Sequence, residues 1–154
     1  MSTKLISKTK VILKIDYVEV NGHKFYVDNK KVVIDPSKKE LNMASWLSKI
    51  FNKNVYILPK VHLPEGIKTA DYLINNEKWD LKNIVSNRNN AIYNRIRKNE
   101  NQSSNFIIDI SRTKLTIKSA TKQIEELFIS KNFKWFKRAL IKKNKEYIII
   151  VRQK

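Results

Sequence analysis

The stretch Thr69-Ala-Asp-Tyr-Leu-Ile-Asn-Asn-Glu-Lys-Trp-Asp-Leu-Lys82 predicts a β-hairpin with a two-residue turn. The turn is Asn75-Asn76, and asparagine tolerates the positive φ that a tight hairpin turn demands. A turn of this length places Asp71 opposite Asp80 on the two strands. Because side chains alternate along a strand, Asp71, Asp80 and Lys82 share one face, and the other face is apolar.

The two opposed carboxylates are an unusual pair. Directly opposed acids, with Cβ atoms roughly 4.5–5.5 Å apart, repel each other and destabilise a hairpin. The chain has 32 Lys+Arg against 14 Asp+Glu, so cations are plentiful, yet both positions are acidic. A divalent metal ion held by Asp71 and Asp80 would account for the pair. A third ligand is predicted at Glu40, which shares the inward face of a predicted helix.

The composition limits the kind of metal site. The chain has no cysteine, so thiolate sites are excluded, and its two histidines lie far apart in sequence, so we do not expect a histidine-rich site. A hard cation held by carboxylate oxygens remains, and magnesium, manganese and zinc are the candidates.

The charge points to a polyanionic partner. The formal net charge is +18 and the sequence pI is about 10.1. A globular chain this basic most often meets nucleic acid, and an anionic membrane surface is the rival. We expect no membrane span, since no segment approaches 18 uninterrupted apolar residues. Four cationic residues of a predicted helix are expected to follow a phosphate backbone, namely Arg88, Arg95, Arg97 and Lys98.

The hydrophobic pattern predicts an α/β (α+β) fold with a mixed central sheet flanked by helices. The length of 154 residues fits one domain with a small appendage, which we place at residues 1–35 as an N-terminal β-hairpin element before a core of residues 36–154. Besides the 69–82 hairpin, the predicted strands are 11–20, 23–27, 31–34, 55–58, 106–110, 138–142 and 147–151, and the predicted helices are 37–52, 86–98 and 119–129.

The carboxylates and the lysine together suit phosphodiester hydrolysis. That reaction needs an activated water and stabilisation of negative charge that develops on the phosphoryl oxygens. A metal held by Asp71 and Asp80 would supply the first, and Lys82 would orient the water or offset the charge. The spacing Asp80-Leu-Lys82 puts the carboxylate and the ammonium side by side only on a strand.

Asp71 followed by Asp80-Leu-Lys82 resembles the PD-(D/E)xK nuclease motif, although Ala70 stands where that motif has proline. The runs from Thr69 and from Asn101-Gln-Ser-Ser-Asn-Phe-Ile-Ile-Asp-Ile are similar to the C-terminal toxin domain of contact-dependent growth inhibition (CdiA-type) proteins, described as transfer-RNA nucleases. This resemblance covers residues 58–151.

The resemblance implies a restriction-endonuclease-like core, metal ligands at Asp71 and Asp80, and a catalytic lysine at Lys82. Gln102 and Lys98 are implied as further site residues, and an acidic helix residue such as Glu40 is frequent in PD-(D/E)xK enzymes. The family also implies delivery from a producing bacterium into the cytoplasm of a target cell. A cognate immunity protein is implied too, and an acidic one would associate quickly with so basic a toxin.

Other interpretations stay open from the sequence. The chain could be a metal-independent ribonuclease of the barnase, EndoU, colicin and RelE group, or a basic nucleic-acid-binding module without activity. Asp80 could pair with a neighbouring lysine on a solvated face, and Glu40 could serve only the capping box Ser37-Lys-Lys-Glu40. The cluster around Arg95 could be a solvated helix face.

Overall fold

The chain forms two units, residues 1–77 and 78–154, in the computed structural model. The structure describes residues 9–100 and 102–153, so the first eight residues of the predicted N-terminal element lie outside the described residues. The domain division predicted from the sequence, 1–35 and 36–154, stays a prediction.

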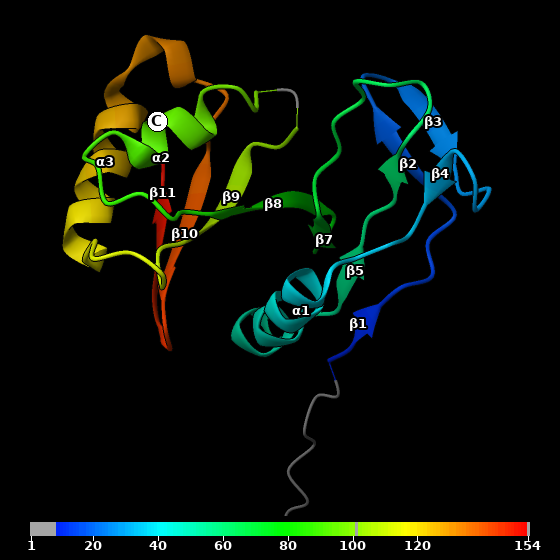
Figure 1. Ribbon diagram of the computed structural model, residues 1–154, viewed down its shortest axis with the longest axis horizontal. Coiled ribbons are helices and arrows are strands. Elements are labelled where there is room, and N and C mark those ends of the chain that lie inside the picture. The colour runs from blue at the N-terminus through cyan, green and yellow to red at the C-terminus, as the bar shows by residue number, and fades with distance from the viewer. Residues whose placement is uncertain (1–8, 101, 154) are drawn as a thin grey trace, which may run out of the picture. The chain divides into compact units, whose positions relative to one another are not determined.

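The first unit contains a small mixed sheet (Figure 1). Its central strand is parallel to one neighbour, with Val11 beside Val55, and antiparallel to the other, with Val55 beside Ile74. The strands in spatial order are β1 (Val11–Ile12), β5 (Val55–Ile57) and β7 (Tyr72–Ile74).

Two short hairpins complete the strands of this unit. Asn21 and Gly22 have φ values of 51° and 82°, which confirms the Asn-Gly turn expected from the sequence. The continuous strand predicted over 11–20 is wrong in its middle, because Val18 and Val20 pack into a separate apolar cluster with Val32. The hairpins pair β2 (Tyr17–Val20) with β3 (His23–Tyr26) and β4 (Val32–Val33) with β6 (Lys60–Val61).

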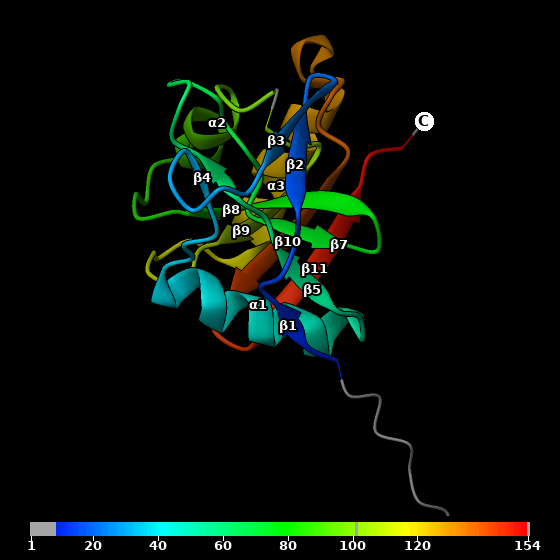
Figure 2. The ribbon, with the colours of Figure 1, turned by 90° about the vertical axis from the view of Figure 1, so that its right-hand side faces the viewer.

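Helix α1 (Lys38–Phe51) packs beside β1 and β5 (Figure 2). It begins at the predicted capping box, in which the Ser37 side chain accepts from the Glu40 N–H and the Glu40 carboxylate accepts from the Ser37 N–H. It ends at Asn52, whose φ of 51° is left-handed. Ala44 and Leu47 are fully buried, as the predicted apolar stripe requires.

The turn of the predicted 69–82 hairpin has the expected backbone. Asn75 and Asn76 have φ values of 52° and 64°, so both adopt the left-handed conformation that a two-residue hairpin turn needs. The turn leads directly from β7 into β8 (Glu77–Asn83). The opposition of Asp71 and Asp80 stays a prediction.

The second unit is built on four strands in the order β8-β9-β10-β11. β8, β9 and β10 are parallel, and β11 runs antiparallel to β10. Phe106 of β9 lies between Asp80 of β8 and Ala139 of β10. A mixed α/β fold is therefore confirmed. The bounds are β9 (Asn105–Asp109), β10 (Arg138–Lys143) and β11 (Glu146–Val151).

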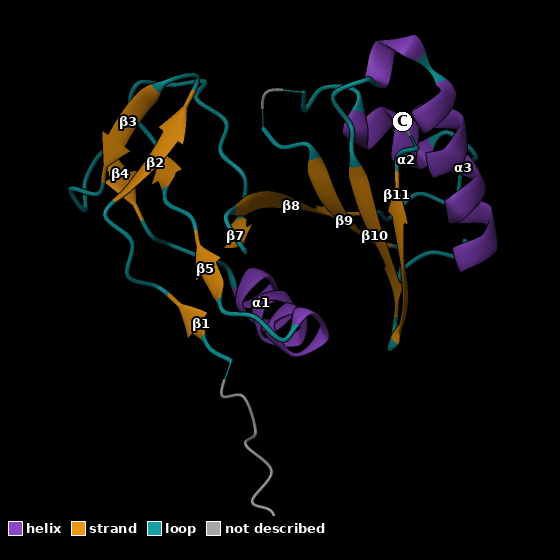
Figure 3. Cartoon of the chain, turned by 180° about the vertical axis from the view of Figure 1, so that it is seen from behind, coloured by secondary structure: helices purple, strands orange, loops and turns teal. Residues whose placement is uncertain are grey.

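Two helices and a short 3₁₀ turn cover one face of these four strands (Figure 3). Helix α3 has a capping box at Thr116 and Ser119 and buries Ala120, Ile124 and Leu127, which fall on one helical face. They pack with alternate residues of the strands, including Phe106, Ile108, Ala139 and Ile141. The helices are α2 (Ala91–Ile96) and α3 (Ile117–Ile129), and the turn is η1 (Lys131–Phe133).

The helix predicted over 86–98 is wrong in length. Its first residues are tied elsewhere, because the Asn87 side chain accepts a hydrogen bond of 2.6 Å from the Lys114 N–H. At the other end the Asn99 side chain donates to the Arg95 carbonyl, close to where α2 ends. Such side-chain bonds to the backbone compete with helix propagation.

Candidate active site

Strand β8 carries Asp80 and Lys82 on the same face of the second unit. Their strand partners are Phe106 and Ile108, which belong to the main apolar core beneath α2 and α3. The predicted shared face is therefore confirmed for these two residues. That face is no solvated surface, however, since the Asp80 side chain is 1% exposed and the Lys82 side chain 10% exposed.

The two side chains form a buried ion pair. The Lys82 Nζ lies 2.7 Å from the Asp80 Oδ2. This distance would suit a charge-assisted hydrogen bond, yet Oδ2 has no hydrogen bond of acceptable direction and is itself buried. We therefore treat the contact as an ion pair in which one carboxylate oxygen retains unused acceptor capacity.

Two amide oxygens hold the other side of the Lys82 ammonium group. Nζ donates to the Asn99 Oδ1 at 3.0 Å and to the Gln102 Oε1 at 3.2 Å. Hydrogen bonds to a charged group contribute about 1.5–3 kcal/mol each, so these bonds fix the lysine in one place. Gln102, which the family resemblance implies as a site residue, thus lies beside Lys82, and its role in the site stays a prediction.

Asn99 was missed by the sequence reasoning. It is 8% exposed and joins α2 to the site, because its side chain donates to the Arg95 carbonyl while accepting from Lys82. It sits among the consecutive polar residues Arg97-Lys98-Asn99-Glu100, and this context gives a buried amide no distinguishing signal.

Asp80 has the chemistry that a hard divalent cation prefers. Its Oδ2 is a buried carboxylate oxygen without a hydrogen-bond partner, which fits the role of a metal ligand. Within the described residues, no three His, Cys, Asp or Glu side chains gather as a complete protein-only metal site. Water or phosphate oxygens would therefore complete the coordination, as they commonly do for magnesium.

The other two predicted metal ligands lie in the first unit. Asp71 is half-buried, and its carbonyl accepts from the Leu58 N–H at 3.0 Å. Glu40 is the capping acid of α1, and its Oε1 also lies 2.9 Å from the Lys60 Nζ. The structural role considered for Glu40 is thus present, and the ligand roles of Asp71 and Glu40 stay predictions.

Glu40 makes the stability of the first unit depend on pH. Burial alone raises the pKa of this carboxyl, but the Lys60 ammonium and the Ser37 N–H outweigh it, and the net pKa lies below its ordinary value. A lowered folded-state pKa stabilises the fold above the ordinary pKa, and this contribution disappears as the pH falls through the folded value.

We expect Glu40→Gln to lower the free energy of unfolding at pH 7, because it removes the charge that attracts Lys60. The loss should be only about 1 kcal/mol, since the Lys60 side chain is 40% exposed and solvent screens the attraction. The difference from the parent should shrink steadily below pH 4, as measured by urea unfolding at several pH values. Glu65→Gln, in an exposed loop, is the matched control and should change little at any pH. A pH-independent difference for Glu40→Gln would contradict the assignment.

The predicted phosphate-binding residues all precede Asn99 in the chain, and three of them lie within four residues of it. Arg88, Arg95, Arg97 and Lys98 are all exposed, and Arg95 belongs to α2. Exposed guanidinium groups suit contact with phosphate oxygens. Their role in nucleic-acid binding and the site role of Lys98 stay predictions.

No helix among residues 9–100 and 102–153 is long and apolar enough to cross a bilayer, as the sequence led us to expect.

Comparison with known proteins places the chain beside a family of bacterial toxins. The family model described as contact-dependent growth inhibition CdiA C-terminal domain matches residues 68–151, which are 84 of the 154 residues. A search of curated proteins found no match. A solved structure described as a CdiA-CT/CdiI toxin and immunity complex from Burkholderia pseudomallei is similar in fold, with a TM-score of 0.57 and 18% identity over 73% of this chain and 82% of that chain.

Proposed function

The chain belongs to the contact-dependent growth inhibition CdiA C-terminal domain family, and on this premise we propose that it is a metal-dependent nuclease toxin that hydrolyses RNA, with transfer RNA as the proposed substrate. One observation carries the proposal. In a chain of net charge +18, an aspartate and a lysine two residues apart are buried together, and amide side chains hold the lysine in place.

Asp80 is the proposed metal ligand of the second unit, through its buried Oδ2. A divalent cation bound there would polarise a phosphoryl oxygen and make a bound water more nucleophilic. Asp71 and Glu40 remain proposed further ligands on the strength of the sequence and of the motif resemblance. Magnesium, manganese and zinc are all compatible with carboxylate oxygens.

Lys82 is the proposed catalytic cation. Its ammonium group would offset negative charge on the phosphoryl group in the transition state and orient the attacking water. Asn99 and Gln102 are positioning residues, because they act on Nζ and keep it beside Asp80. A group held before the reaction begins needs no reorganisation during it, and this preorganisation is what makes such a charge effective.

The exposed cations around α2 are the proposed backbone contacts. Arg88, Arg95 and Arg97 would bind phosphates on either side of the cleaved bond and release condensed counterions. The proposed binding therefore weakens steeply as salt rises. The remaining cations of the +18 chain would speed the first encounter with RNA.

The proposal includes a biological setting that the family relationship supports. The domain would be delivered into target cells, and a cognate immunity protein would neutralise it in cells that make it. The solved relative of similar fold is itself a toxin and immunity complex. An acidic immunity protein would match the positive charge of this chain and associate quickly.

The test is a cleavage assay on transfer RNA and on duplex DNA. The parent chain is assayed with added magnesium, manganese or zinc and again with excess EDTA, beside Asp80→Asn. Asp109→Asn is the matched control in the same unit, since the Asp109 Oδ1 only accepts from the Ser111 N–H and an asparagine oxygen can do the same. We expect cutting of RNA that needs metal and falls about a hundredfold or more in Asp80→Asn but not in Asp109→Asn.

The other outcomes separate the alternatives. Cutting that survives both EDTA and Asp80→Asn would favour a metal-independent ribonuclease. Salt-sensitive binding of RNA without any cutting would favour a plain binding module. Cutting of duplex DNA in preference to transfer RNA would replace the proposed substrate and keep the site.

A further inference from the structure

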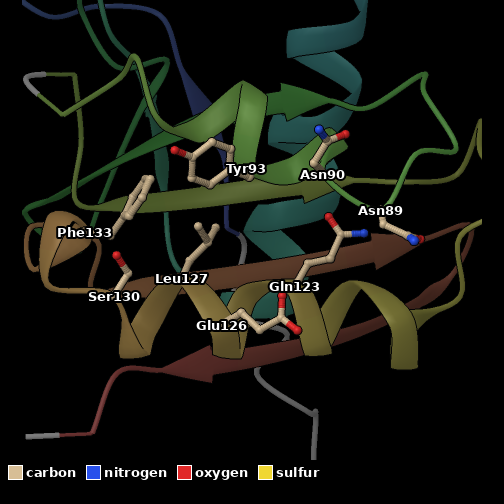
Figure 4. Close-up of a pocket in the computed structure, with 8 residues that line it drawn as sticks. All are labelled: Asn89, Asn90, Tyr93, Gln123, Glu126, Leu127, Ser130 and Phe133. Atoms are coloured by element: carbon tan, nitrogen blue, oxygen red, sulfur yellow. The ribbon is translucent and has the colours of Figure 1, made fainter.

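A cavity of about 250 Å³ lies in the second unit, apart from the contacts of Asp80 and Lys82. Figure 4 shows side chains of α3 pointing toward those of α2 and of the residues just before it. The cavity is smaller than the 300 Å³ or more of typical drug-sized sites, so it suits a small flat group such as one heteroaromatic base. The lining residues are Asn89, Asn90, Tyr93, Gln123, Glu126, Leu127, Ser130 and Phe133.

The lining differs in character from the rest of this basic chain. It includes no lysine or arginine, although the chain has 32 of them, so the cavity is no phosphate site. It combines amide, hydroxyl and carboxylate groups with aromatic rings. This combination recognises an unstacked nucleobase, which has a flat apolar face and a hydrogen-bonding edge.

Tyr93 is the candidate stacking residue. It is 44% exposed, and its ring lies 5.4 Å from that of Phe133 at an angle of 60°, so the edge contact limits how the tyrosine can turn. Stacking of a base on an aromatic side chain strengthens binding for every base alike. Stacking on Tyr93 would therefore favour any base, and only the polar groups of the cavity could distinguish one base from another.

Gln123 and Glu126 bring hydrogen-bonding groups of α3 to the cavity. The Gln123 Oε1 accepts a hydrogen bond of 3.3 Å from the Ile92 N–H, which fixes the amide orientation because a backbone N–H needs an acceptor. The Nε2 group therefore remains as the donor. Glu126, three residues later on the same helical face, adds two carboxylate acceptors. The pair presents one donor followed by two acceptors.

Guanine is the base whose edge complements this pattern. It presents the O6 acceptor, then the N1–H donor, then the N2 amino donor, whereas adenine, cytosine and uracil each lack at least one of these matches. Asn90 adds an exposed amide to the lining, and it occupies the N-cap position of α2 without making a capping bond. We propose that this cavity binds a guanine base, with Gln123 and Glu126 on its hydrogen-bonding edge and Tyr93 on its face.

The source of the guanine rests on the proposed function: it is a nucleotide of the RNA substrate near the cleaved bond. A guanine of a free nucleotide has the same edge. Arg88 stands two residues before the cavity residue Asn90 and is exposed, so an RNA backbone leaving the cavity would meet a cation. The RNA source therefore predicts tighter binding of an oligonucleotide than of a mononucleotide.

The experiment measures binding by NMR in the absence of any cutting. Guanosine, inosine, adenosine, cytidine and uridine are titrated into the ¹⁵N-labelled parent chain, and the shifts of the Gln123 side-chain amide and the Tyr93 backbone amide are followed. The nucleosides are uncharged, so the +18 surface does not contribute. We expect guanosine to bind about ten times more tightly than the other nucleosides, including inosine, which lacks the 2-amino group.

Two glutamine variants make the test specific. Glu126→Gln should weaken guanosine binding about tenfold or more, because it replaces an acceptor of two hydrogen bonds by an amide. Glu125→Gln removes the same charge from an exposed neighbour outside the cavity and should bind guanosine like the parent. Equal binding of all nucleosides, or unchanged guanosine binding by Glu126→Gln, would overturn the assignment.

A second arm identifies the source of the base. The RNAs UUGUU and UUAUU and guanosine monophosphate are titrated into Asp80→Asn, and UUGUU should bind most tightly. Tighter binding of the mononucleotide would overturn the RNA source. Nucleoside binding is measured without cleavage, so the two proposals can fail separately. If the chain binds guanosine but cuts no RNA, only the proposed nuclease activity is refuted. If it cuts RNA but does not prefer guanosine, only the proposed guanine site is refuted.

Discussion

Lys82→Met is expected to lower the free energy of unfolding by about 3–5 kcal/mol and to reduce RNA cutting by about a hundredfold or more. The substitution removes the cation that lies 2.7 Å from Asp80 and leaves a carboxylate with 1% exposure without its partner. It also removes the ammonium group that donates to the Asn99 Oδ1 and the Gln102 Oε1. Removing one half of a buried ion pair costs more than removing both halves.

A double variant separates the structural effect from the catalytic one. Asp80→Asn combined with Lys82→Met removes the unpaired charge, so we expect most of the lost stability to return while cutting stays absent. Urea unfolding and the transfer-RNA assay on the parent, both single variants and the double variant complete the cycle. If stability fails to recover, the ion pair is not the reason that the two residues are buried. If cutting recovers, neither residue takes part in the reaction.

Arg152→Met is expected to lower the free energy of unfolding by about 3 kcal/mol without touching the site at Asp80. The Arg152 Nε donates to the Phe136 carbonyl at 2.7 Å, and its two terminal nitrogens donate to the carbonyls of Leu127, Phe128 and Phe133. These carbonyls lie at the end of α3 and around η1, where the helix leaves its last carbonyls unsatisfied. The carbonyls of Leu127 and Phe133 also accept from the N–H groups of Ser130 and Phe136, so the loss falls mainly on the carbonyls of Phe128 and Phe136. Each unmet carbonyl in a partly buried place costs about 1 kcal/mol or more, and the lost bonds from a charged guanidinium group add to this cost.

The shape of the guanidinium group gives the control for this prediction. Arg152→Lys keeps the charge but loses the planar fork, so it should recover only part of the stability. Arg97→Met, an exposed residue, makes the same substitution with little expected effect on unfolding. An Arg152→Met variant whose urea midpoint matches that of Arg97→Met would show that the carbonyls find other donors.

Local signals in the sequence predicted much of the fold. Ser37 and Glu40 predicted the start of α1, and Asn21-Gly22 predicted a hairpin turn. Asn75-Asn76 predicted a second turn, and both of its residues have positive φ. Each of these signals acts within a few residues, where backbone chemistry decides. The helix at residues 91–96 was overextended because the bond between Asn87 and the Lys114 N–H is a contact between distant segments.

One contact of the candidate site could also be predicted from the sequence, whereas the roles of Asp71, Glu40 and Lys98 stay predictions. The alternation of side chains on a strand was enough to bring Asp80 and Lys82 together. Their burial was not predictable, since it depends on packing beneath α2, and a lysine has no local signal for being buried. The amide of Asn99 reached the site only through the bend that follows α2, and polar residues of a basic segment look alike in a sequence.

The parallel arrangement of β8, β9 and β10 also bears on when activity returns during refolding. Parallel neighbours require a crossover, so their contacts join segments far apart in the chain, and such contacts form slowly. Asp80 and Lys82 lie on the first strand, whereas the amides that hold the lysine lie on the crossover to the second. A refolding chain that has regained its helices would therefore still be inactive. Its activity would return late, together with tertiary packing and not with helix content.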